Sequence, residues 1–150
     1  MSKFVFKLQA LLNIKEQMED SLKNELGKAI QELEKNKEIL KEIQKEKDKC
    51  LNELSLKARG KFVPKELKEY IVYISYLKHK IKLQKENVKS AQENVDKVRE
   101  ELLAVMQERE VLEKLKEKKY KHFMEEELRK ENKLIDEIVS FKYSTNGDIP

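Results

Sequence analysis

The chain has 150 residues, of which 41% are charged and 39% apolar, with three glycines, two prolines and no tryptophan. This composition is typical of long helices and differs from that of a globular domain. No run of about 18 apolar residues occurs, so we expect no membrane-spanning segment. The single cysteine, Cys50, cannot form an internal disulfide, which fits a reducing compartment.

Charge is distributed unevenly along the chain. Residues 41–89 contain 14 Lys or Arg and 7 Asp or Glu, so this region carries +7 within a net charge of +4. At the N-terminus, Lys7 and Gln9 interrupt the apolar residues of MSKFVFKLQALLNIK, and no small-residue cleavage site follows. We therefore expect a cytosolic protein without a signal peptide.

The first half of the chain predicts one helix over about residues 4–57. Residues spaced alternately three and four apart mark the seam of a coiled coil. They follow two registers: Phe4, Leu8, Leu11, Lys15, Met18 and Leu22, then Leu26, Ala29, Leu33, Asn36, Leu40, Ile43, Lys47, Cys50 and Leu54. Two successive steps of four join the registers at Leu22, which predicts a stutter that locally unwinds the supercoil.

The segment SLKARGKFVPKEL predicts a turn over residues 58–64. Gly60 suits a left-handed helix end, and Pro64 suits the first turn of the next helix.

After the turn, an unbroken seam predicts a second helix over about residues 65–141, followed by a frayed tail over 142–150. The seam residues are Leu67, Tyr70, Ile74, Leu77, Ile81, Gln84, Val88, Ala91, Val95, Val98, Leu102, Val105, Arg109 and Leu112. The predicted fold class is all-α: a long two-helix antiparallel coiled-coil hairpin that forms a single coiled-coil domain over residues 1–150.

An apolar stripe near the C-terminus predicts a docking surface. Folding the hairpin about residue 61 pairs Phe4 with a position near 118, so about the last 23 residues of the second helix would overhang without a partner. The stripe comprises Tyr120, Phe123, Met124, Leu128, Leu134, Ile135, Ile138, Val139 and Phe141. Phe4 and Phe6 lie at the same end. The stripe would bind another protein, fold back on the first helix or dimerise.

A second apolar surface is expected in KEYIVYISYLKHKI. Tyr70 belongs to the seam, Tyr73 flanks it and Tyr76 points away, because a step of three residues turns a helix by about −60°. The outer positions are Val72, Tyr76, His79 and Leu83. Exposed aromatics at helical spacing favour a binding patch, and the alternative is scattered surface apolarity.

Catalytic and nucleotide-binding chemistry finds little support in the sequence. The three glycines form no phosphate loop, and His79 and His122 have no cysteine pair beside them, so we expect no enzyme activity, no cofactor and no metal site. Adjacent Asp136 and Glu137 suit a helix surface that contacts a basic partner. Acids interrupt the lysine-rich run KLKEKKYKH, so we expect no nucleic acid partner.

Three segments together resemble the flagellar export protein family FliJ over nearly the full length. They are the opening FVFKLQALLNIKEQMED, the mid-chain KEYIVYISYLKHKI, and VLEKLKEKKYKHF followed by ENKLIDEIVSF. The resemblance implies an antiparallel coiled coil similar to the central stalk of rotary ATPases. It implies a cytoplasmic component of the type III export apparatus, peripheral at the inner face of the cell membrane through its partners. These partners would be the export ATPase hexamer, the membrane export gate and export chaperones.

The resemblance also implies site residues. The family's gate-contacting aromatic and leucine fall on Tyr73 and Leu77, and with the outer face they give a gate site of Val72, Tyr73, Tyr76 and Leu77. Lys80 and Gln84 replace the small residue and histidine of the family pattern. The stalk role falls on the terminal end, at Phe4, Phe6, Tyr120, Phe123, Met124, Leu128, Ile135, Asp136, Glu137 and Ile138.

Two alternatives remain at this stage. The chain could be the stalk protein of a virulence type III secretion system, which shares the architecture. It could instead be a general coiled-coil scaffold, whose terminal stripe would self-associate and whose tyrosines would be dispensable.

Overall fold

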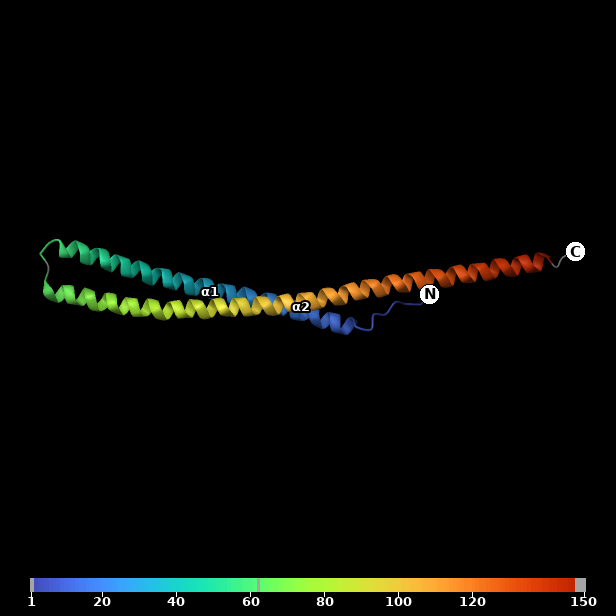
Figure 1. Cartoon of the computed structure of the whole chain (residues 1–150), viewed down its shortest axis with the longest axis horizontal. Helices are drawn as coiled ribbons and strands as arrows, with labels where there is room; N and C mark the ends of the chain where they lie inside the picture. Colours follow the sequence, from blue (N-terminus) through green and yellow to red (C-terminus); the bar gives the residue numbers. More distant parts are fainter. Residues whose placement is uncertain (1, 62, 148–150) are drawn as a thin grey trace. The chain divides into compact units, whose positions relative to one another are not determined.

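The computed structural model describes residues 2–61 and 63–147 and contains two helices, α1 (Gln9–Ala58) and α2 (Pro64–Gly147) (Figure 1). This confirms the predicted all-α fold of two long helices. The chain divides into two compact units: unit 1 is Met1–Glu19 with Ala104–Pro150, and unit 2 is Asp20–Leu103. The prediction of a single coiled-coil domain stays a prediction.

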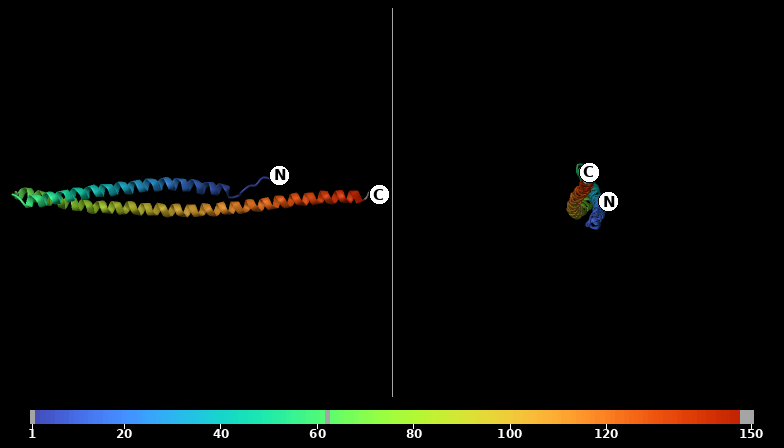
Figure 2. Two further views of the ribbon diagram at one scale, coloured as in Figure 1. Left: turned by 90° about the horizontal axis from the view of Figure 1, so that it is seen from above. Right: turned by 90° about the vertical axis from the view of Figure 1, so that its right-hand side faces the viewer.

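Unit 2 is an antiparallel pairing of α1 with α2. The chain reverses at the turn, and the two helix segments beside it lie next to each other in both Figure 1 and the left view of Figure 2. Cross-helix hydrogen bonds give the direction: Tyr70 donates to Glu53 at 3.1 Å, and further from the turn Gln84 donates to Asn36 at 3.1 Å. Residue numbers therefore fall along α1 as they rise along α2.

Apolar seam residues hold unit 2 together in two clusters. One contains Ile43, Cys50, Ile74, Leu77 and Ile81, and the other contains Ala29, Leu33 and Val95. Every one of the predicted α2 seam residues is buried or half-buried. Each buried aliphatic side chain contributes roughly 1.5–3 kcal/mol to folding, so this seam is the principal source of stability.

A polar layer interrupts the apolar seam of unit 2. The amide nitrogen of Gln84 donates to the backbone oxygen of Asn36 at 2.9 Å, and the Gln84 side-chain oxygen accepts from Asn87 at 3.1 Å. Because burying an unpaired amide is costly, these contacts favour the one register that brings Gln84 opposite Asn36.

The predicted stutter in α1 is wrong. Leu11 and Met18 are exposed, whereas Leu12 and Glu19 are buried and Lys15 is half-buried. The seam therefore runs from Leu12 in the same alternation of three and four that continues to Leu54. The buried Glu19 carboxylate can occupy the seam because Arg109, a seam residue of α2, forms an ion pair with it.

α1 begins at Gln9, and the prediction of a helix from Phe4 is wrong. Residues 2–6 are extended, and Lys7 and Leu8 form a turn before the helix. The alternation Phe4, Val5, Phe6 explains this, since only Phe4 and Phe6 turn toward α2 while Val5 is exposed. We call residues 2–8 the strap.

The other helix ends also differ from prediction. Gly60 has no positive φ, and the end of α1 is tightened instead by hydrogen bonds from Arg59 to Leu56 and from Gly60 to Lys57. α2 starts at Pro64 and continues to Gly147, six residues beyond the expected end. The last three residues of the predicted frayed tail lie outside the described residues. Over the residues that the structure describes, neither helix has a stretch apolar enough to cross a lipid bilayer.

Candidate functional site

The mid-chain surface of unit 2 consists of Val72, Tyr73 and Tyr76, which are all exposed on α2. The two tyrosine rings stack with their centroids 6.2 Å apart, and the Lys80 ammonium lies 6.0 Å from the centroid of the Tyr76 ring. Tyr76 is 56% exposed. An aromatic pair flanked by a cation is the kind of surface that binds another protein.

Tyr73 is held in place by α1. Its hydroxyl donates to the Glu46 carboxylate at a distance of 3.5 Å. Partial burial, followed by the negative charge of Glu46, raises the pKa of Tyr73 above its usual range. The phenol therefore stays neutral to a higher pH than that of an unperturbed tyrosine, and the Tyr73 side chain remains exposed.

Leu77 does not belong to this exposed surface. Its side chain is 3% exposed and packs in the unit 2 cluster with Ile43, Cys50 and Ile74. It lies in the seam one turn beyond Tyr73, so a partner docked on the mid-chain surface would not reach it in this structure. The resemblance placed Tyr73 and Leu77 together in a gate site, which stays a prediction; in the structure Tyr73 is exposed and Leu77 is buried.

The terminal surface of unit 1 is formed by the strap, the part of α2 that the strap contacts, and the exposed apolar residues of α2 beyond it. The Phe4 ring meets the Tyr120 ring edge-on with centroids 5.2 Å apart, and the Phe123 ring lies 5.5 Å away. The Ser2 hydroxyl donates to the Glu127 carboxylate. Phe6 is 8% exposed and packs with Leu12 and Leu112, so it anchors the strap and offers little surface to a partner.

The C-terminal stripe is the exposed apolar part of α2 beyond the strap. Every described side chain from Leu128 to Thr145 is exposed. The predicted site residues Met124, Leu128, Ile135, Asp136, Glu137 and Ile138 are all accessible, and the stripe also includes Leu134, Val139 and Phe141. The overhang itself stays a prediction. The exposed apolar side chains recur at helical spacing, which favours docking to another protein.

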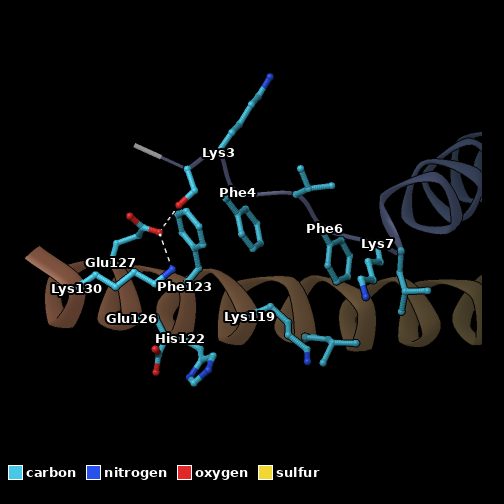
Figure 3. A pocket seen from close by; sticks show the side chains of 14 residues that line it. Lys3, Phe4, Phe6, Lys7, Lys119, His122, Phe123, Glu126, Glu127 and Lys130 are labelled. Atoms are coloured by element: carbon cyan, nitrogen blue, oxygen red, sulfur yellow. Dashed lines mark hydrogen bonds and ion pairs between the residues drawn. The ribbon is translucent and has the colours of Figure 1, made fainter.

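A groove of about 740 Å³ lies between the strap and α2 (Figure 3). Its apolar lining comes from Phe4, Val5, Phe6, Leu8, Leu115 and Phe123, and its polar and charged lining from Ser2, Lys3, Lys7, Lys119, His122, Glu126, Glu127 and Lys130. Sequence reasoning missed this groove because it assigned residues 4–8 to a helix. The alternating FVF, typical of an extended segment, was the available signal.

The described residues offer no metal site, since no three His, Cys, Asp or Glu side chains are placed to hold an ion. His79 and His122 lie in different units.

Comparison with known proteins gives one finding. The family model described as "Flagellar FliJ protein" matches residues 3–148 of the chain. No curated protein and no solved structure matches.

Proposed function

Because the chain belongs to the FliJ family of flagellar proteins, we propose that it couples the flagellar export ATPase to the membrane export gate. The family consists of non-catalytic components of the flagellar export apparatus. A protein without catalytic chemistry acts through what it binds. The observation that carries the proposal is that each unit presents its own exposed apolar surface.

The terminal surface of unit 1 would bind the ATPase ring and promote its assembly. Its C-terminal stripe places Ile135 and Ile138 on an exposed helix, with the acids Asp136 and Glu137 between them. An apolar helix face flanked by acids suits a partner with an apolar and basic lining.

The mid-chain surface of unit 2 would bind the export gate. The exposed Tyr73 and Tyr76 rings supply rigid aromatic area, and tyrosine is among the residues enriched at binding hot spots. Through the gate, the protein would lie at the inner face of the cell membrane. Export chaperones are further proposed partners.

ATP hydrolysis by the cognate export ATPase tests the terminal surface. The full chain should stimulate hydrolysis as it is titrated in, and a variant ending at Lys130 should not, because it lacks the exposed side chains from Glu131 onward. This variant retains the strap and its contacts. Failure of the full chain to stimulate would overturn the coupling proposal.

Binding to the cytoplasmic part of the gate protein tests the mid-chain surface. Tyr73→Ala with Tyr76→Ala should weaken gate binding and leave ATPase stimulation intact. A matched control is Leu103→Ala with Val111→Ala, which removes two exposed apolar side chains elsewhere on α2. If the tyrosine variant loses gate and ATPase binding equally, the division between two surfaces is wrong. Self-association of the full chain through the C-terminal stripe, without ATPase binding, would instead support a scaffold.

A further inference from the structure

The groove between the strap and α2 has features that none of the residue roles above explain. The strap, its contacts on α2 and the whole groove belong to unit 1. We infer that this groove binds an extended acidic peptide segment of a partner protein, which pairs alongside the strap. The inference rests on the proposed function, because the groove adjoins the proposed ATPase-binding surface. It adds the chemical class of the peptide that would bind there.

The charges around the groove favour an acidic partner. Lys3, Lys7 and Lys119 line it, are exposed, and form no ion pair with any residue that the structure describes. Both acids of the lining are already engaged. Glu126 pairs with Arg129 at 3.0 Å, and Glu127 accepts from Ser2 and pairs with Lys130 at 3.9 Å. Three uncompensated cations beside an apolar lining match a peptide that carries both carboxylates and apolar side chains.

The strap offers a backbone edge to an extended peptide. Among the described residues, its only backbone hydrogen bonds to protein are accepted, by the carbonyls of Phe6 and Leu8. The remaining N–H and C=O groups of residues 3–7 are therefore available for pairing, as at the edge of a sheet. Figure 3 shows Phe4 and Phe6 pointing toward α2 and Lys3 pointing away.

An extended peptide fits both features at once. Its successive side chains point to opposite sides, so one set would contact the apolar lining and the other would face the lysines. An anionic membrane surface fits less well, because the apolar lining lies in a groove between the strap and α2, which a narrow extended peptide can enter and a flat bilayer surface cannot.

Fluorescence anisotropy with the full chain tests the inference. The probe is a labelled peptide of about eight residues, matched to the strap, in which Val and Glu alternate. Comparators alternate Val with Lys and Ser with Glu. We expect binding of the Val and Glu peptide only, weakening as salt is raised because the lysines are exposed to solvent.

Charge reversal localises the site. Lys3→Glu with Lys7→Glu and Lys119→Glu should weaken binding by about tenfold or more, since three exposed ion pairs are lost. The matched control, Lys82→Glu with Lys89→Glu and Lys97→Glu, makes the same change in net charge on exposed lysines of unit 2 and should bind normally. Equal weakening by both triple variants would overturn the site, and circular dichroism shows whether each variant folds.

Two further readouts separate the remaining outcomes. Amide hydrogen exchange of residues 3–7 should slow when the peptide binds, and unchanged exchange would refute pairing with the strap. Binding to phosphatidylglycerol vesicles without peptide binding would replace the peptide with a lipid surface. ATPase stimulation without peptide binding would overturn the inference alone, whereas peptide binding without stimulation would overturn the coupling proposal alone.

Discussion

Truncation of Leu77 to alanine should destabilise unit 2 and affect gate binding only indirectly. The side chain is 3% exposed and contacts the cluster around Ile43 and Ile74, so the change removes three buried carbons. Buried Leu→Ala substitutions cost roughly 2–5 kcal/mol. Half-buried Leu40 and Leu54 flank this site and can move into the space, which favours a value of about 3 kcal/mol within that range.

Urea unfolding followed by far-ultraviolet circular dichroism measures this effect. With an m-value near 2 kcal/mol/M, a loss of about 3 kcal/mol lowers the midpoint by roughly 1.5 M. Leu77→Met, which conserves volume, should restore most of the stability and the gate binding with it. Exposed Tyr76→Ala should show the opposite pattern, with a nearly unchanged midpoint and weakened gate binding. If Leu77→Ala abolished gate binding at an unchanged midpoint, Leu77 would be a direct contact and its assignment to the seam would be refuted.

Three other substitutions test the packing. Arg109→Leu should lower the melting temperature by several degrees, because Glu19 loses a charged partner in the seam. Adding Glu19→Leu should recover the melting temperature. Sedimentation of this double variant should then reveal additional oligomers, because a polar pair in a seam specifies the oligomeric state. Burial and the charge of Glu46 raise the pKa of the Cys50 thiol, so the folded chain holds the thiol proton more tightly than the unfolded chain does. The stability that this gives is complete below the ordinary thiol pKa of about 8.5 and is lost as pH rises above it. Cys50→Ala removes this titration, so the urea midpoint should fall less at alkaline pH. Phe6→Ala should release the strap locally, so amide exchange of residues 3–7 should accelerate while the melting temperature of the whole chain changes little. A large fall in melting temperature would contradict local release.

The α2 seam was predictable because its apolar residues repeat without interruption. From Ile74 to Val105 only one predicted seam residue, Gln84, is polar, and its partner Asn36 was already in the predicted seam of α1. The exposed positions of Val72 and Tyr76 follow from the same periodicity. Where one apolar stripe dominates a helix, burial follows from the sequence alone.

The first register of α1 could not be predicted from hydrophobicity. The seam could contain either Leu11 and Met18 or Leu12 and Glu19. The first pair is the more apolar, so hydrophobicity favoured the wrong positions. The cross-helix ion pair between Glu19 and Arg109 favours the observed register, and a contact between residues 90 positions apart is invisible in a local pattern. Buried Leu77 illustrates a second limit, since a residue's family role does not say whether its side chain reaches the surface.

The extended strap also determines where α2 becomes free to bind a partner. Leu12 packs with Leu112, so a helix continued backwards to Ser2 would bring that residue beside a position near 122. An extended chain advances about 3.3 Å per residue against 1.5 Å in a helix, and Ser2 instead reaches Glu127. The exposed run then begins at Leu128, directly after this last strap contact. The N-terminal residues thus contact Tyr120 and Phe123 and leave α2 open from Leu128 onward. A variant ending at Lys130 therefore keeps the strap contacts and removes most of the open helix.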